Sequence, residues 1–184
     1  MKTIFAVIGA AALLAVAGIA AVAIMGYYDM GADAPHWRAV ERAVGWSRTR
    51  SVSTHASDVS VPSFDAQAVK DGAREYDEMC VGCHLAPGQV DRTLHDSMYP
   101  RPPDFTKAAA EPRAAFWTIK HGIKMSGMPA WGQSHDDKTI WTMVAFLQKL
   151  PGMGEPAYRE MLGVERPEME HEGSPGHSHA IQSH

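Results

Sequence analysis

Two cysteines and a histidine within five residues are the part of this sequence whose types and spacing are best suited to chemistry. Cys80 and Cys83 are three positions apart, His84 follows directly, and no other cysteine occurs in the 184 residues. Two thiols this close can bind a metal ion, exchange a disulfide, or bond covalently to one rigid group. Two cysteines are too few for a disulfide framework, so the motif has to perform one of these three chemistries.

The neighbouring sequence favours the third chemistry. A structural zinc site needs four Cys or His ligands, but Cys83 and His84 are adjacent and no second paired cluster follows. A dithiol redox centre usually follows a strand and opens a helix, whereas a helical pattern precedes this motif. C-x-x-C-H is the attachment motif of a c-type haem. In that case both thiols bond to the vinyl groups and the histidine reaches the iron.

The haem interpretation requires a second axial ligand, which a downstream loop offers. Met125 and Met128 lie 41 and 44 residues after His84. A methionine ligand raises the haem potential and suits electron transfer, whereas a methionine without this role would fill the core. We favour Met128 because Pro129 restricts the backbone beside it and Gly127 allows a close approach. The alternative imidazole ligands are His95, His121 and His135, each of which could instead be a surface histidine.

The N-terminal segment predicts a membrane helix. From Ile4 to Met25 there are 22 uncharged residues, which as a helix would span roughly 33 Å, about one hydrocarbon core. Tyr27 and Tyr28 follow, where interfacial aromatic residues are common, and Lys2 favours a cytoplasmic start. A cleaved signal peptide is the alternative, because Ala21–Ala23 fits a small-x-small cleavage site. Both interpretations export the rest of the chain.

The chain divides into four stretches. We expect an N-terminal membrane anchor or signal-like segment over residues 1–28 and a juxtamembrane helix followed by a linker over 29–63, the linker composition beginning at residue 51. A globular domain occupies residues 64–160. A disordered tail of low hydrophobicity covers 161–184.

Helical periodicity predicts three helices within the globular domain. The first begins at the N-cap Asp65 and runs to the cysteine motif, the second covers 111–122, and the third ends before Pro151. The proline-rich segment 90–106 is expected to be a loop, and no alternating strand pattern occurs. The domain is therefore expected to be all-α, with so much loop that a bulky apolar ligand would help to stabilise it.

From about Asp65 to Leu150 the chain resembles a class I c-type cytochrome, and with its anchor it is similar to a membrane-anchored bacterial monohaem type. The resemblance rests on Gly72 and Tyr76 ahead of the C-x-x-C-H motif, on Met128 followed by proline, and on Phe146, the aromatic expected to cross Gly72. It implies an all-α, cytochrome c-like helical domain around one covalent haem c, preceded by one transmembrane helix.

The resemblance also implies roles for residues around the haem. The cofactor would be attached through the two cysteines, with His84 and Met128 as axial ligands of the iron. The carbonyl of Pro102 or Pro103 would accept a hydrogen bond from His84, which orients the imidazole. The residues implied to face the haem propionates are Tyr99, Arg101 and Trp131; a solvated arginine and core aromatic side chains are the alternative.

These features predict an electron carrier rather than an enzyme, because filled axial positions leave no site for a substrate. The expected location is the bacterial inner membrane, single-pass, with the haem domain in the periplasm. The implied partners are a quinol–cytochrome c oxidoreductase, a terminal oxidase or a periplasmic dehydrogenase. The alternatives are a cytochrome c subunit of a larger membrane oxidoreductase and a gas-binding haem sensor.

Charge and composition bear on two further interactions. The net charge of −4 gives the chain no basic footprint for nucleic acid. The tail offers weak copper, nickel or zinc binding through its histidines, with a solubilising tail as the alternative. These histidines are His171, His177, His179 and His184.

Overall fold

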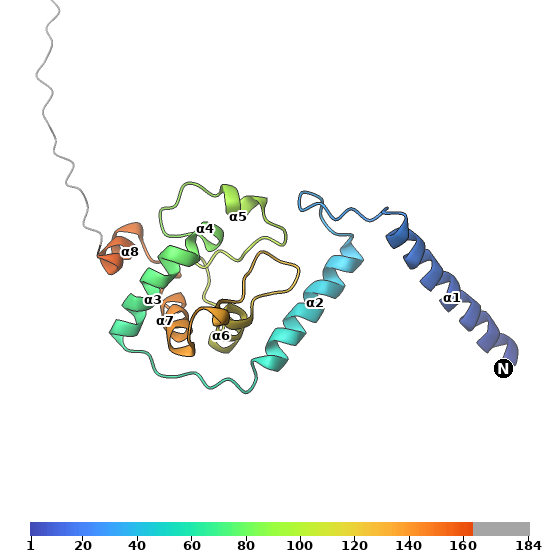
Figure 1. Cartoon of the computed structure of the whole chain (residues 1–184), viewed down its shortest axis with the longest axis horizontal. Coiled ribbons are helices and arrows are strands. Elements are labelled where there is room, and N and C mark those ends of the chain that lie inside the picture. The colour runs from blue at the N-terminus through green and yellow to red at the C-terminus, as the bar shows by residue number, and fades with distance from the viewer. Residues whose placement is uncertain (164–184) are drawn as a thin grey trace, which may run out of the picture.

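The computed structural model describes residues 1–163, and this part of the chain contains helices and turns but no strand. The all-α prediction is confirmed over these residues. Figure 1 shows α1 apart from the folded domain, with α2 between them. The elements are α1 (Lys2–Ile24), α2 (Arg38–His55), α3 (Ala66–Met79), α4 (Val81–His84), α5 (Thr93–Ser97), α6 (Pro112–His121), the 3₁₀ turn η1 (Trp131–Gln133), α7 (Asp137–Leu147) and α8 (Glu155–Leu162).

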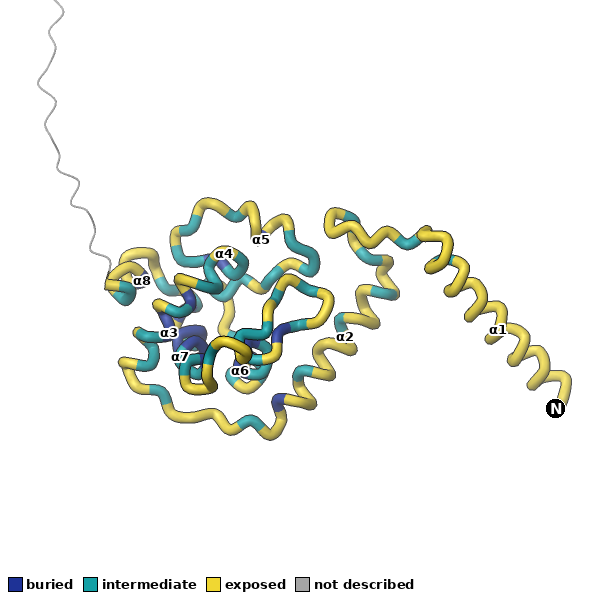
Figure 2. The backbone as a smooth tube through the Cα atoms, in the orientation of Figure 1, coloured by how far each residue is buried: buried dark blue, intermediate teal, exposed yellow. Residues whose placement is uncertain are grey.

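The first helix, α1, is long and apolar enough to cross a membrane. It has 23 residues, its most apolar window has a mean hydropathy of 2.6, and none of that window is buried against protein. Figure 2 shows exposure along almost all of this helix. An apolar helix of about 20 residues with no protein cover is what a hydrocarbon core accommodates.

The second helix, α2, continues five residues into the segment expected to be linker, so the expected helix end at residue 50 was wrong. Contacts with α6 hold this last turn. The His55 ring stacks on Trp117 at 5.6 Å between centroids, and Ala56 is buried. Arg113 Nη1 also donates to the Ser57 carbonyl at 3.1 Å. Local Ser- and Val-rich composition was overridden by tertiary packing.

The centre of the domain is the crossing of α3 and α7. An ideal Cβ on Gly72 would lie 1.8 Å from the Thr142 carbonyl oxygen, so the two backbones touch where only glycine fits. Phe146 is fully buried, and its ring centroid lies 5.3 Å from that of Tyr76. The predicted crossing is confirmed, but its contacts differ from the expectation. Gly72 meets the Thr142 backbone, and Phe146 packs one turn further along, against Tyr76.

The starts of α3 and α7 have side-chain caps, and the first of these confirms the predicted N-cap Asp65. The Asp65 carboxylate accepts from the Ala68 amide at 2.7 Å, and the Asp136 carboxylate accepts from the Thr139 amide at 2.8 Å. Such caps satisfy amide donors that have no partner inside the helix. They fix where α3 and α7 begin and hence the register of the crossing.

Three helices were not predicted: α4, which covers part of the cysteine motif, α5 and α8. The five-residue α5 lies inside the segment expected to be loop. The eight-residue α8 runs to Leu162 and so continues beyond residue 160, where the domain was expected to end. It is held by Tyr158, which is buried and whose hydroxyl donates to Asp77 at 2.7 Å. The four tail histidines lie outside the described residues.

Candidate functional site

The cysteine motif forms one tight helical turn at the end of α3. The amides of Cys83 and His84 both donate to the Cys80 carbonyl, at 3.1 and 2.8 Å. Residues three apart in such a turn project from the same side, so this turn presents the two thiols together. Both thiols are free and partly buried.

The environment of Cys80 disfavours thiolate chemistry. Burial, with smaller contributions from Cys83 and Glu75, raises the pKa of the Cys80 thiol to about 12. Disulfide exchange and metal binding both need the thiolate, so at neutral pH this thiol is poorly suited to a redox-active dithiol pair.

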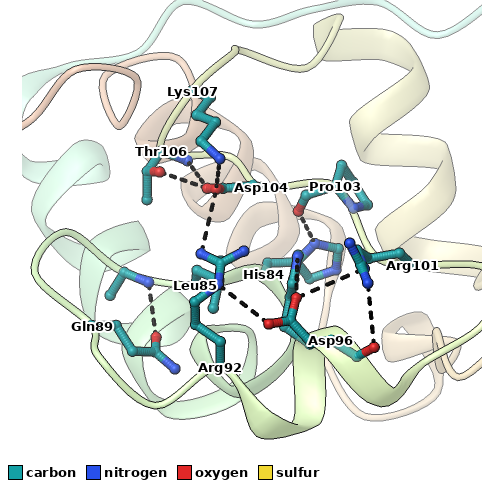
Figure 3. A network of polar contacts seen from close by, with 12 residues as sticks. His84, Leu85, Gln89, Arg92, Asp96, Arg101, Pro103, Asp104, Thr106 and Lys107 are labelled. Atoms are coloured by element: carbon teal, nitrogen blue, oxygen red, sulfur yellow. Dashed lines mark hydrogen bonds and ion pairs between the residues drawn. The ribbon is translucent and has the colours of Figure 1, made fainter.

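His84 is held in one tautomer by the segment that follows α5. Its ring nitrogen Nδ1 lies 2.9 Å from the Pro103 carbonyl oxygen (Figure 3). A carbonyl can only accept, so Nδ1 carries the proton and Nε2 keeps a lone pair for a ligand. Burial lowers the pKa of His84, which favours the neutral imidazole. Of the two prolines predicted for this contact, Pro103 makes it, and the Phe105 ring stacks on the imidazole at 4.7 Å.

A buried tyrosine fixes the backbone at the residue where the chain leaves the cysteine turn. Leu85 has a backbone φ of 67°, a conformation uncommon for residues other than glycine. The Tyr76 hydroxyl donates to the Leu85 carbonyl at 2.6 Å, and both residues are buried. This hydrogen bond joins α3 to the residue directly after His84 and limits the freedom of the imidazole.

For His95 the sequence left two possibilities, an alternative axial ligand or a surface histidine, and the second is wrong. It is 2% exposed, and its Nδ1 lies 2.7 Å from the Cys83 carbonyl oxygen. Because the carbonyl accepts, His95 donates and pins the cysteine turn from the side of α5. No pattern in the sequence distinguishes this histidine, since α5 itself has no clear sequence signal.

A partly buried carboxylate, Asp104, braces the loop that presents the Pro103 carbonyl. Asp104 accepts from the Thr106 amide at 3.1 Å and pairs with Lys107 Nζ at 3.0 Å. Arg92 Nη1 lies 3.9 Å away on another side (Figure 3). Burial alone would raise the pKa of Asp104, but the bonds from Thr106 and Lys107 outweigh it and lower that pKa. The ionised carboxylate therefore stabilises the loop conformation.

The residues predicted to face propionates have other contacts in the structure. Arg101 Nη2 donates weakly to the Asp96 carbonyl at 3.5 Å, and its side chain is mostly exposed. The Tyr99 hydroxyl accepts from the His36 amide at 3.2 Å. Trp131 is partly buried against the core. Their roles toward a haem stay predictions.

The methionine loop separates its two methionines clearly. Met128 is partly buried and packs against the core, whereas Met125 is 90% exposed. The Met128 amide donates to Ser126 Oγ at 3.2 Å, and its carbonyl accepts from the Ile123 amide at 3.2 Å. Gly122 closes the loop with φ of 66°, and a Cβ there would lie 2.8 Å from the Met128 carbonyl oxygen. The loop thus has one fixed methionine and one free in solvent.

The other two candidate histidine ligands make contacts away from the cysteine turn. His121 is exposed and packs against the Trp117 ring at 4.9 Å. His135 lies edge-on to Trp131, with its Nδ1 2.8 Å from Ser134 Oγ. Among residues 1–163, no three His, Cys, Asp or Glu side chains gather so as to hold a metal ion. The zinc alternative therefore finds no support in this part of the chain.

An open depression of about 490 Å³ lies outside this site. It is lined by Leu85 to Gln89, by part of the segment Asp104 to Lys107, and by Gly152 to Glu155, together with Arg92. It contains neither thiol, nor His84, nor Met128, so it is not part of the candidate site.

Comparison with known protein families identifies the type of this domain. Residues 67–147 match the family model described as "Cytochrome C oxidase, cbb3-type, subunit III". The match runs from the start of α3 to the end of α7 and includes the cysteine turn and the methionine loop. This part of the chain is a class I c-type cytochrome domain. No curated protein and no solved structure matches the chain.

The cytochrome c family implies a haem c, and the residues of this domain fit one. Cys80 and Cys83 offer two free thiols on one turn. His84 is held neutral with Nε2 unprotonated, and Met128 offers a thioether on a side chain packed against the core. These are the donor types of a His/Met haem site that functions in electron transfer.

Proposed function

We propose that this chain is a membrane-tethered periplasmic electron-transfer protein with one covalent haem c. Cys80 and Cys83 would form thioethers with the vinyl groups, and His84 and Met128 would bind the iron from opposite faces. The observation that carries the proposal is the hydrogen bond from His84 Nδ1 to the Pro103 carbonyl. It leaves Nε2 as a ligand directly after two free thiols, inside a cytochrome c domain.

A haem bound there would supply a reversible one-electron iron couple. The residues of the chain keep its surroundings constant during that exchange. Pro103 fixes the direction of the imidazole, while Tyr76 and His95 hold the C-terminal end of the cysteine turn. A rigid, preorganised site needs little reorganisation when the charge on the iron changes. With both axial positions filled, the chain would carry electrons and not bind a substrate.

The proposed membrane tether is the helix α1. A 23-residue apolar helix near the N-terminus would hold the domain beside the bacterial inner membrane, with the haem in the periplasm. Tethering raises the local concentration of the carrier near membrane partners. Such partners are a quinol–cytochrome c oxidoreductase, a terminal oxidase or a periplasmic dehydrogenase.

A second candidate function is a permanent subunit of a larger membrane oxidoreductase. The matching family is described as a subunit of a cytochrome c oxidase, and the chemistry of the domain would be the same. Extraction of native membranes in a mild detergent separates the two. Migration of the chain alone supports a free carrier, whereas comigration with a stoichiometric set of membrane subunits supports the oxidoreductase.

The proposed site is tested on the purified full chain. We expect haem to stay attached after denaturation and organic extraction, and attachment to fall in both Cys80→Ala and Cys83→Ala. We also expect the reduced protein to leave carbon monoxide unbound at neutral pH. Rapid carbon monoxide binding would refute the six-coordinate carrier and favour a gas sensor. Haem that extracts freely would refute covalent attachment.

A further inference from the structure

The juxtamembrane helix α2 carries a line of basic residues with a tryptophan among them. Arg38, Arg42, Trp46 and Arg50 recur at every fourth position, and residues at this spacing lie along one face of a helix. We call these four residues the arginine–tryptophan stripe. Glu41, the one acidic residue of α2, does not belong to the series. All the charges in the stripe are therefore positive.

Among residues 1–163 the stripe is exposed, and its side chains form no ion pair. All four residues are exposed, and Trp46 has 73% of its surface open to solvent. The arginines that form ion pairs within residues 1–163 are Arg74, Arg92, Arg101 and Arg159, none of them in α2. Arginines without carboxylates around an exposed tryptophan are typical of an interaction surface for an anionic partner.

Other residues, at and just before the two ends of α2, contact the cytochrome domain. At its C-terminal end, His55 stacks on Trp117 at an interplanar angle of 9°. Just before its start, the His36 amide donates to the Tyr99 hydroxyl, and the two rings lie edge to face at 5.1 Å. Contacts at both ends hold α2 against the domain, so whatever binds the stripe also orients the domain.

The position of α2 relative to α1 identifies the partner. Only 13 residues separate Ile24, the end of α1, from Arg38, the start of α2. Figure 1 shows α2 between α1 and the domain and running across the direction of α1. If α1 spans a membrane, such a helix runs along its surface. A basic helix with tryptophan is suited to that position, because arginine is attracted to anionic headgroups and tryptophan prefers the interface.

We propose that the arginine–tryptophan stripe docks on anionic phospholipid headgroups of the membrane that α1 spans. The proposal rests on the membrane-tether part of the proposed function. An acidic protein partner would offer the same charge, but α1 keeps the stripe beside the bilayer at all times, which favours lipid by local concentration. Docking gives the cytochrome domain one fixed orientation on the membrane. This orientation determines which face of the domain a redox partner can contact.

The test uses the full chain in nanodiscs made of phosphatidylcholine alone or of phosphatidylcholine with phosphatidylglycerol. Some acyl chains carry bromine near the headgroup, and bromine quenches tryptophan that reaches the interface. The difference between wild type and Trp46→Phe isolates the signal of Trp46. We expect quenching of Trp46 in discs with phosphatidylglycerol, and its loss in neutral discs or at high salt, since salt screens exposed charges.

Two arginine variants separate the stripe from general charge. Arg42→Gln removes one stripe residue and is expected to lower the ratio of docked to undocked domain about fivefold. Arg48→Gln removes the same charge two residues after Trp46, roughly 200° around the helix, and is expected to leave the ratio nearly unchanged. Equal effects of the two variants would overturn the stripe as the docking element.

The outcomes also separate this proposal from the tether. A chain that enters discs but shows the same Trp46 quenching in neutral and anionic lipid overturns the docking proposal alone. A chain that stays outside all discs overturns the tether and the docking proposal together. Lipid-dependent quenching that responds to Arg42 and not to Arg48 supports both.

Discussion

Replacing Gly72 with alanine tests whether the helix crossing that carries the cysteine turn needs direct backbone contact. The new Cβ would lie 1.8 Å from the Thr142 carbonyl oxygen, 2.4 Å from its carbon and 3.0 Å from the Met143 amide nitrogen. Carbon and oxygen normally approach to about 3.3 Å. The helices α3 and α7 would therefore have to separate by roughly 1.5 Å, and the contact between Tyr76 and Phe146 would loosen with them.

The cost follows from the kind of atoms that collide. Overpacking a core costs about 1–3 kcal/mol, and the upper end applies because no side-chain rotation can relieve a clash with backbone. For a domain of this size, about 3 kcal/mol lowers the melting temperature by roughly 12–24 °C. Thermal unfolding of the full haem-loaded chain in detergent, followed by near-ultraviolet circular dichroism, measures this change.

A glycine in open space provides the control. Gly45 lies in the middle of α2 with no heavy atom within 4 Å of its ideal Cβ position. Gly45→Ala should be neutral or about 0.5–1 kcal/mol more stable, because glycine is costly inside a helix. If Gly72→Ala lowers the free energy of unfolding by less than about 0.5 kcal/mol, the backbones of α3 and α7 do not touch. The described geometry of their crossing is then wrong.

Three further substitutions test the hydrogen bonds and ion pairs that hold the site in place. Tyr76→Phe removes the donor to the buried Leu85 carbonyl and should cost about 1–3 kcal/mol in urea unfolding; an unchanged midpoint would contradict the contact. His95→Phe should cost a similar amount by leaving the Cys83 carbonyl without its donor, and should lower the yield of attached haem; full yield would argue against a role in holding the turn. Asp104→Asn should destabilise the domain at neutral pH. Because the folded state lowers the pKa of Asp104, the contribution is present above its ordinary value of about 3.9 and is lost as pH falls through the folded pKa. Melting curves of both proteins should converge in acid, and a constant difference would refute this origin.

The elements that could be predicted from sequence are those set by local patterns. The caps at Asp65 and Asp136, the glycine at position 72 and the C-x-x-C-H turn each have a short-range signal that a single chain displays. Met128 differs from Met125 in the sequence by its following proline, and in the structure it is the one packed on the core.

What could not be predicted depends on contacts between distant segments. The burial of His95 arises only when α5 folds onto the cysteine turn, and α5 has five residues with no periodic signal. The last turn of α2 and the helix α8 are held by Trp117 and Asp77, far away in the sequence. The choice of Pro103 over Pro102 likewise depends on loop geometry, which Asp104 fixes through its neighbours.

The central claim is that His84 and Met128 bind one haem iron, and the ferric absorption spectrum tests it most directly. A methionine–ferric iron bond gives a weak long-wavelength band that other ligand pairs lack. We expect this band in the wild-type chain and in Met125→Ala, and its loss in Met128→Ala together with a lower reduction potential, because the thioether stabilises reduced iron. A band that survives in Met128→Ala, or disappears in Met125→Ala, would contradict the account.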